Sequence, residues 1–503
     1  MGNGKVFLVG AGPGDPKLIT LRGKEAIEQA DVIVYDRLSH PSLLHYAKPE
    51  TEKIYVGKRP DHHTLQQEEI NQLIVDKALE GHLVTRLKGG DPSIFGRVGE
   101  EAEALVEHGI PFEIVPGITS AIAVPAYAGI PVTHRNFTSS LAIVTGHEDP
   151  TKNESSINWG KLSTATGTLI FLMGVANLPL IQKKLIENGR DESTPIALIR
   201  YGTRVEQQTV VGTLKDIIQK VEEARLTSPA IIIIGEVVRL REKLEWFEKK
   251  PLFGKRVLVT RARSQASELS FMIQELGGEP VEFPVIKTIP PRDMTDYHQA
   301  IAKLGQFDWI IFTSVNGAQS FFDQLRELKI DIRRMAKARI AAIGPKTAQV
   351  LEERGLIVDV LPQEFRAEGL LNSLSGQLRP GQKVLLPRAD IARKVLPEQL
   401  TAKGLEVLEV DAYETVIDAE NKEEIIEMLR EKKIHIITFT SSSTAQNFVE
   451  ALQGEPLLEL LEGVTLASIG PITTDTATSL GLSIQVTADE YTIPGLVKAI
   501  SEK

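Results

Sequence analysis

Short apolar runs recur along the whole chain, and charged residues, glycine or proline follow many of them. In the first half such runs cover residues 6–9, 32–35 and 83–88, and a helical pattern occupies about residues 100–108. Strands of this length that alternate with helices are typical of parallel α/β sheets. We therefore predict an α/β fold in which ligands bind where the strands end.

The run over residues 83–88 ends in Gly89-Gly90-Asp91-Pro92. Two glycines without Cβ atoms allow a flat ligand to lie directly against the backbone, and Asp91 adds a charged acceptor. An ordinary strand-ending turn would have the same composition, and one short motif does not decide between the two. Only the presence of further motifs in the chain favours a ligand-binding loop over an ordinary turn.

A second glycine loop, Gly10-Ala11-Gly12-Pro13-Gly14-Asp15-Pro16, follows the first apolar run. A dinucleotide fingerprint requires a third glycine at position 15, and Pro13 removes a backbone donor. The loop is thus a poor fit for a pyrophosphate. An NAD-binding domain remains an alternative, because Asp36 follows the next run at about the spacing of a ribose ligand.

Length and composition limit the other possibilities. A chain of 503 residues is long enough for two to four domains. It contains no cysteine, which excludes thiolate metal sites and cysteine nucleophiles, and we expect no metal site. A net charge of −10 argues against nucleic acid as a partner. Without an apolar run of membrane-spanning length or a signal-peptide pattern, we expect a cytoplasmic protein.

Further motifs stand in order along the first half, namely Tyr35-Asp36-Arg37, Lys58-Arg59, Thr133-His134-Arg135 and Trp246-Phe247. Together with the two glycine loops, they make residues 4–247 resemble uroporphyrinogen-III C-methyltransferase, of the tetrapyrrole methylase superfamily. The resemblance implies a two-lobed fold that binds S-adenosylmethionine and methylates uroporphyrinogen III twice, giving precorrin-2. The chain departs from the family pattern at Ser93, where the family has Phe, and at Val98, where it has Gly.

The same resemblance assigns roles to individual residues. The cofactor contacts would be Pro13, Gly89, Gly90, Asp91, Ile94, Thr119, Ser120, Met173, Gly202 and Ala230, although core packing would explain Met173 equally well. Asp36 and Lys58 would be the base and acid, with a surface ion pair as the alternative. Arginine and histidine side chains would bind the substrate's carboxylates, and the candidates are Arg37, Arg59, Arg97, His134 and Arg135.

A short polar, proline-bounded linker at Glu248-Lys249-Lys250-Pro251 precedes an internal repeat. The segment Phe312-Thr313-Ser314 returns as Phe439-Thr440-Ser441, and Val257-Leu258-Val259 returns at the same offset as Val384-Leu385-Leu386. A third segment, Ile343-Gly344-Pro345, returns as Ile469-Gly470-Pro471, one residue short of that offset. We therefore expect two similar parallel-sheet lobes. Each hydroxyl-rich turn taken alone is best explained as a helix N-cap, but several facing one cleft would bind an anionic substrate.

Residues 252–503 resemble uroporphyrinogen-III synthase, which closes hydroxymethylbilane to uroporphyrinogen III. The resemblance implies one lobe of about 252–286 with 416–503 and another of about 288–413, whereas the repeat alone predicts simple tandem units. It makes Tyr413 catalytic, with a strand tyrosine at an inter-lobe hinge as the alternative. The hydroxyls of the repeated turns would bind substrate, and the candidates are Thr313, Ser314, Ser441 and Thr473.

We interpret the chain as a bifunctional enzyme of tetrapyrrole biosynthesis, with domains at 1–250 and 251–503 and S-adenosylmethionine as its cofactor. Family analogy implies a homodimer through the methyltransferase half. The alternatives are an NAD-linked oxidoreductase fused to an α/β ligand-binding module, and a methylase of a later corrin intermediate. The product would enter sirohaem or cobalamin synthesis, and the motifs do not distinguish between the two.

Overall fold

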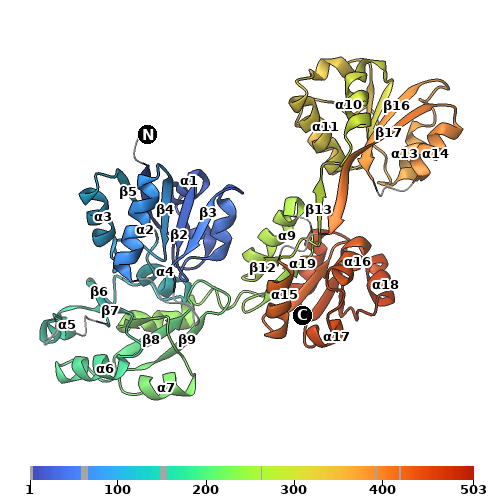
Figure 1. Ribbon diagram of the computed structural model, residues 1–503. Coiled ribbons are helices and arrows are strands. Elements are labelled where there is room, and N and C mark those ends of the chain that lie inside the picture. Colours follow the sequence, from blue (N-terminus) through green and yellow to red (C-terminus); the bar gives the residue numbers. More distant parts are fainter. Residues whose placement is uncertain (1–3, 58–65, 148–155, 262, 391–393, 418–420) are drawn as a thin grey trace. The chain divides into compact units, whose positions relative to one another are not determined.

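The computed structural model describes residues 4–57, 66–147, 156–261, 263–390, 394–417 and 421–503. The chain divides into two compact units. One comprises residues 1–257 with 271–280 and 501–503, and the other comprises residues 258–270 with 281–500. Each contains sheets covered by helices (Figure 1).

The first unit opens with a parallel sheet whose strand order is β3(Glu52–Tyr55), β2(Val32–Tyr35), β4(Leu83–Lys88), β1(Lys5–Gly10), β5(Phe112–Val115). Both faces are apolar. Leu8 and Val34 pack against α2(Gln67–Leu79) and α3(Val98–Glu107), and Val9 and Ile33 pack against α1(Leu21–Gln29). Because all strands run in one direction, the loops after β1, β2, β4 and β5 gather at one edge.

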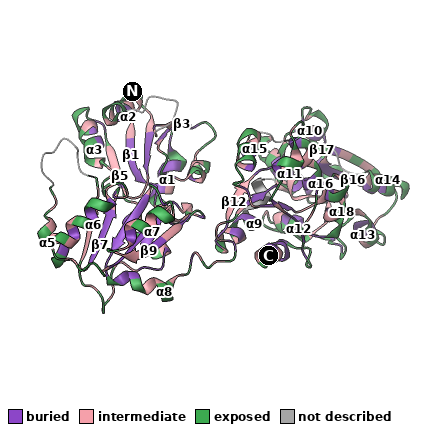
Figure 2. Cartoon of the chain, turned by 90° about the horizontal axis from the view of Figure 1, so that it is seen from below, coloured by how far each residue is buried: buried purple, intermediate pink, exposed green. Residues whose placement is uncertain are grey.

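A second sheet of the same unit has the order β6(Leu141–Thr145), β7(Thr168–Leu172), β10(Ala230–Ile234), β8(Pro195–Arg200), β9(Gln208–Thr213). It is mixed, because β10 runs antiparallel to both β7 and β8. Helices α4(Ser120–Tyr127), α5(Trp159–Ala165), α6(Leu178–Glu187) and α7(Ile217–Glu223) belong to this part of the chain. All five residues of β10 are buried, as are most of those in β1 and β7 (Figure 2).

Two further five-stranded sheets follow. One has the order β12(Glu279–Glu282), β11(Arg256–Val259), β18(Ile436–Phe439), β19(Thr465–Ser468), β20(Val486–Thr487). The other has the order β13(Ile286–Ile289), β17(Glu406–Ile417), β16(Lys383–Ala389), β14(Trp309–Phe312), β15(Arg339–Ala342). The helices of this half include α9(Arg263–Glu275), α11(Val315–Glu327), α12(Pro345–Glu352), α14(Val395–Ala402), α16(Ser442–Ala451) and α18(Pro471–Ser479). The predicted α/β class is confirmed.

The internal repeat corresponds to three neighbouring strands in each of these sheets. The repeated segments form β11, β18 and β19 in one sheet and β16, β14 and β15 in the other, in the same lateral order. The repeated strands are equivalent in space but are not in tandem along the chain, because all strands of the other sheet, β13 to β17, come between β11 and β18. The predicted lobe limits stay predictions.

The polar segment after Trp246 carries more structure than its composition indicates. The Glu248 carboxylate accepts hydrogen bonds from Gln207 Nε2, Thr209 Oγ1 and Arg241 Nη2, each at 2.7 Å. Phe247 is buried, and its ring lies edge-on to that of Tyr127, with the centroids 4.8 Å apart. The residues up to Glu248 are therefore packed onto the first unit.

Candidate functional site

Three loops at the carboxyl edge of the first sheet meet through their main chains. Gly90 N donates to Gly12 O at 2.7 Å, and Gly12 N donates to Gly90 O at 3.2 Å. A Cβ on Gly10 would lie 2.5 Å from Gly117 Cα, and one on Gly117 would lie 2.3 Å from Gly90 O. No side chain fits between these loops, so the glycines are required by close backbone approach.

Asp91 links the loop after β4, in which it lies, to the loop after β5. Its Oδ1 accepts from Ser93 N at 2.7 Å, and its Oδ2 accepts from Gly117 N at 2.9 Å. Hydrogen bonds from main-chain donors to a carboxylate are among the stronger ones in proteins. The sequence prediction made Asp91 an acceptor for the cofactor, and here both of its oxygens have a main-chain partner.

The main chain at Gly90 faces the N-terminus of α4. Gly90 has φ of 73°, which favours glycine, and a Cβ there would have Ser120 N and Thr119 Cα as neighbours at 3.7 and 3.9 Å. Thr119 caps α4, since its Oγ1 accepts from Ala121 N at 3.3 Å. A main-chain surface without a side chain, beside a helix N-terminus, fits a flat, polar ligand such as an adenosyl group.

Three further predicted cofactor residues lie at one edge of the second sheet. Met173 follows β7, Gly202 follows β8, and Ala230 begins the antiparallel β10, where it is paired with Arg200. Gly202 packs against α4, because a Cβ there would lie 2.3 Å from Val124 Cγ1. Met173 is 54% exposed, so core packing does not explain it.

Strained backbone concentrates around these positions. Eight non-glycine residues in the described part of the chain have positive φ, and five of them lie at or beside predicted site residues. They are Phe95, Arg97, Met173, Tyr201 and Thr203, with φ between 47° and 71°. Strain of this kind persists only where the surrounding structure enforces it, and it clusters at functional sites.

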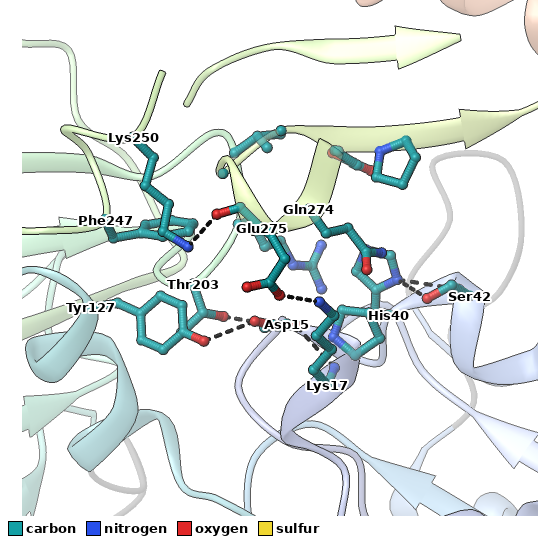
Figure 3. A pocket seen from close by; sticks show the side chains of 18 of the residues that line it. Asp15, Lys17, His40, Ser42, Tyr127, Thr203, Phe247, Lys250, Gln274 and Glu275 are labelled. Atoms are coloured by element: carbon teal, nitrogen blue, oxygen red, sulfur yellow. Dashed lines mark hydrogen bonds and ion pairs between the residues drawn. The ribbon is translucent and has the colours of Figure 1, made fainter. Parts of the chain in front are cut away.

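The loops after β1 and β8 are joined directly. Asp15 N donates to Thr203 Oγ1 at 2.9 Å, and Tyr127 Oη donates to Asp15 Oδ2 at 2.8 Å (Figure 3). Burial, reinforced by Asp15, raises the pKa of Tyr127. The pocket in Figure 3 is lined by residues that include Asp15, His40, Tyr127 and Thr203, and none of the predicted site residues lines it.

Asp36 follows β2 at the same edge as the glycine loops. Its Oδ1 accepts from Leu38 N at 3.0 Å, and its Oδ2 lies 3.5 Å from Arg86 Nη2. The Asp36 side chain is 25% exposed, whereas that of Arg86 is 4% exposed. Asp36 is therefore a carboxylate with a partner on each oxygen and with some access to solvent, and the alternative of a surface ion pair with Lys58 stays open. Lys58 lies outside the described residues.

The predicted substrate cations differ in their surroundings. Arg97 pairs with Glu100 through two hydrogen bonds of 2.8 and 2.5 Å, which lowers the pKa of Glu100. The His134 ring lies beside that of Phe137, with centroids 5.0 Å apart and planes tilted by 40°. Arg37 and Arg135 are exposed, with no ion pair to a described carboxylate. Arg59 lies outside the described residues.

In the second half, the predicted hydroxyls are helix caps as well as candidate ligands. Ser314 caps α11 by accepting from Gly317 N at 3.0 Å, and Ser441 caps α16 by accepting from Thr444 N at 3.2 Å. Tyr413 Oη donates to Ser314 Oγ at 3.1 Å, and burial raises the pKa of Tyr413. Two predicted residues therefore meet, although they lie on β17 and at the start of α11.

The other two predicted hydroxyls differ in accessibility. Thr473 is 5% exposed, and Thr313 is half-buried. Beside Thr473, a chain of hydroxyls that sequence reasoning missed joins Thr474 Oγ1 to Ser468 Oγ at 2.6 Å and to Thr487 Oγ1 at 2.7 Å. Threonine and serine are too common at strand ends for this cluster to have been found from the sequence.

Two searches of the described residues were negative. No group of three or more histidine, aspartate and glutamate side chains in the described part of the chain is arranged to hold a metal ion. No helix among the described segments has both the length and the apolar character needed to cross a bilayer.

Comparison with known proteins matches each half to one family. The Tetrapyrrole (Corrin/Porphyrin) Methylases match residues 5–218, and Uroporphyrinogen-III synthase HemD matches residues 267–498. The porphyrin biosynthesis protein HemD of Ruminiclostridium josui is 41% identical over 503 residues, covering 100% of this chain and 98% of its own. The S-adenosyl-L-methionine-dependent uroporphyrinogen III methyltransferase of Methanosarcina barkeri is 53% identical, covering 48% of this chain and 94% of its own.

A solved structure is also similar to the first half. The uroporphyrin-III C-methyltransferase of Thermus thermophilus, complexed with S-adenosylhomocysteine, is 38% identical and covers 47% of this chain and 100% of its own, with a TM-score of 0.41. The sequence relationships extend over both halves. The chain therefore belongs to the porphyrin biosynthesis family in which an S-adenosylmethionine-dependent uroporphyrinogen-III C-methyltransferase and a uroporphyrinogen-III synthase are fused.

Proposed function

We propose that the second half closes hydroxymethylbilane to uroporphyrinogen III and that the first half methylates this product twice to give precorrin-2. The observation that carries the methylation is the meeting of the Gly10, Gly90 and Gly117 loops beside Asp36, at one edge of the first sheet. It supplies a main-chain surface for a cofactor and a carboxylate for a proton within one site.

The cofactor would lie against the main chain at Gly90 and the capped end of α4. S-adenosylmethionine, when bound, supplies a methyl group that is already activated, so the protein needs no nucleophile. Holding the donor and the acceptor carbon in line is then the main catalytic task. The second sheet of the first unit would contribute Met173, Gly202 and Ala230, which lie at one of its edges.

Asp36 would accept the proton that the pyrrole carbon loses on methylation, with Lys58 as the acid. A carboxylate that keeps partial access to solvent can take up and release this proton. The exposed Arg37 and Arg135, together with Arg59, Arg97 and His134, would bind the substrate's carboxylates. In the second half, Tyr413 would lie near the leaving hydroxyl, held by Ser314, with Thr313, Ser441 and Thr473 as further substrate contacts.

The direct test supplies the purified chain with hydroxymethylbilane and S-adenosylmethionine, followed by mass analysis of the tetrapyrrole. We expect a product two methyl groups heavier than uroporphyrinogen III. Omission of S-adenosylmethionine should leave uroporphyrinogen III itself. A chain that closes the ring but adds no methyl group would refute the methylation, and binding of NAD in place of S-adenosylhomocysteine would favour the oxidoreductase alternative.

Replacing Asp91 with Ala should weaken S-adenosylmethionine binding by about 1–3 kcal/mol, the scale of a lost hydrogen bond to a charged group. The variant loses the hydrogen bonds from Ser93 N and Gly117 N, and the second of these joins the loop after β4 to the loop after β5. Asp91→Asn keeps one acceptor and should have a smaller effect. Calorimetric titration with S-adenosylhomocysteine measures both, and unchanged affinity in Asp91→Ala would remove Asp91 from the site.

Division of the chain after Lys249 should give two active fragments. Fragment 1–249 keeps Phe247 on Tyr127 and the three hydrogen bonds of Glu248. Fragment 1–249 should methylate uroporphyrinogen III, and fragment 250–503 should produce uroporphyrinogen III from hydroxymethylbilane. A mixture of the two should convert hydroxymethylbilane to precorrin-2. Circular dichroism and the two assays test this, and failure of either fragment to fold would show that the domain boundary is misplaced.

We also propose that the protein is cytoplasmic and forms a homodimer through its methyltransferase half. The similarity of the chain to enzymes of porphyrin biosynthesis supports these assignments. Analytical ultracentrifugation of fragment 1–249 and of the full chain tests the second, and monomers of both would contradict it.

A further inference from the structure

Beneath Asp36 lies a group of buried charges that the cofactor and substrate sites do not use. Arg86 and Lys88 lie two residues apart on β4, on the face that packs against α2 and α3, and they are 4% and 6% exposed. Glu101 of α3 is 1% exposed. Its Oε1 accepts from Lys88 Nζ at 2.7 Å, Arg86 Nε at 3.2 Å and Gln67 Nε2 at 3.2 Å.

These contacts fix the orientation of the Arg86 guanidinium. Its Nη1 donates to the carbonyl oxygens of Val34 and Leu87 at 3.4 and 3.2 Å, and its Nε donates to Glu101. Its Nη2 is then directed at Asp36 Oδ2, 3.5 Å away. Glu101 is the only carboxylate in the described residues, apart from Asp36, that pairs with Arg86.

The arrangement is not one that stability alone favours. Taking several charges out of water costs free energy that ion pairing often does not recover, and apolar residues of the same size would pack as well. Moreover, Glu101 Oε2 is buried without a hydrogen-bond partner, while three donors share Oε1. A buried network with an unpaired oxygen calls for a reason other than stability.

We propose that Glu101 is a positioning residue of the methyl-transfer site, which holds Arg86 and thereby orients the Asp36 carboxylate, and whose charge balances the two buried cations. The inference rests on the proposed role of Asp36 as the base. Arg86 and Lys88 contribute two positive charges and Glu101 and Asp36 two negative ones, so the group is balanced. Burial lowers the pKa of Lys88, and Glu101 acts against this effect.

The charge of Glu101 has a measurable consequence at Asp36. The charged and titratable groups around Asp36 are Arg86 and Lys88 on β4, Glu101 behind them on α3, Arg37 in its own loop, and the phenol of Tyr55 on β3. Removing the negative charge leaves an excess positive charge near Asp36, which stabilises the ionised carboxylate. The acidic limb of the pH–rate profile then shifts to lower pH, because the base stays deprotonated there.

The test compares the full-length Glu101→Gln variant with wild type and with Glu103→Gln, an exposed glutamate on the same helix. We expect Glu101→Gln to lower kcat about 10²-fold, the scale of a misplaced catalytic group. S-adenosylhomocysteine affinity should be unchanged, and the acidic limb should move to lower pH. Glu103→Gln should behave as wild type, and circular dichroism together with the retained affinity for S-adenosylhomocysteine reports that the first half of each variant is folded.

A double variant, Glu101→Gln with Lys88→Met, removes one charge of each sign. Its acidic limb should return to the wild-type position while kcat stays low, because Arg86 is still not held. If Glu101→Gln does not fold, this balanced variant decides. Wild-type turnover in either variant would overturn the inference. So would a loss of turnover that is matched by an equal loss of cofactor affinity, with the acidic limb of the pH–rate profile unshifted. Failure of wild type to methylate would instead refute the proposed function.

Discussion

Asp36→Asn is expected to lower the turnover of methylation by about 10²–10⁴-fold, the contribution of a general base. Asparagine has nearly the same size, and its carbonyl oxygen can still accept from Leu38 N, so the loop after β2 should keep its shape. Because the cofactor surface at Gly90 is formed by other loops, the affinity for S-adenosylhomocysteine should change little. Single-turnover kinetics at saturating S-adenosylmethionine measure the first quantity, and calorimetry measures the second.

Asp31→Asn provides the matched control. Asp31 precedes the same strand, and its Oδ2 accepts from Leu83 N at 2.9 Å, so it has a similar hydrogen-bonding role at the opposite edge of the sheet. This variant should methylate at the wild-type rate. If Asp36→Asn loses cofactor affinity and keeps its turnover at saturation, Asp36 binds the cofactor and is not the base.

Gly117→Ala should weaken cofactor binding by about 10–100-fold, since forcing extra atoms into a closely packed site costs about 1–3 kcal/mol. The added Cβ would lie 2.3 Å from Gly90 O and 2.7 Å from Gly10 Cα. Both neighbours are main-chain atoms, so no side chain can rotate away, and the Gly10 and Gly90 loops must separate. Calorimetric titration with S-adenosylhomocysteine measures the loss.

Gly99→Ala is the corresponding control, because nothing lies within 4 Å of the position that its Cβ would occupy. It lies in α3, where alanine is favoured over glycine by about 0.5–1 kcal/mol. Cofactor affinity should therefore be unchanged and the free energy of unfolding slightly higher. A Gly117→Ala variant with wild-type affinity would show that these loops can separate without affecting the cofactor.

The sequence was most informative where local pattern determines structure. The apolar runs at 6–9, 32–35 and 83–88 became β1, β2 and β4, because short β-rich runs between breakers have few other ways to bury themselves. The loops that follow them were also predicted in the right place, since parallel strands deliver their ends to one edge. The individual cofactor and substrate contacts stay predictions.

The buried charges were not predictable in the same way. Arg86 and Lys88 lie within a run that predicts a buried strand, and nothing in the sequence indicates which carboxylate would pair with them. Only the packing of α3 on the sheet brings Glu101 to them, across thirteen to fifteen positions of sequence. The backbone strain at Met173 and Tyr201 was hidden too, because neither residue type favours positive φ.

The repeat in the second half shows a limit of a different kind. Similar segments predicted similar lobes, and β11, β18 and β19 do have the same lateral order as β16, β14 and β15. Similarity between segments cannot, however, state which strands share a sheet. That depends on where the chain leaves one sheet and where it returns to it. Between the neighbouring strands β11 and β18, well over a hundred residues intervene.

The positive φ values of Met173, Tyr201 and Thr203 bear on how this protein could be engineered. Glycine at such positions removes steric strain from the folded state, although it also gives the unfolded chain more freedom. At Thr203 it would in addition delete the hydroxyl that accepts from Asp15 N. Substitutions selected for heat resistance in these loops should therefore cost catalytic efficiency, so a thermostable variant is better sought in the helices that cover the far ends of the sheets.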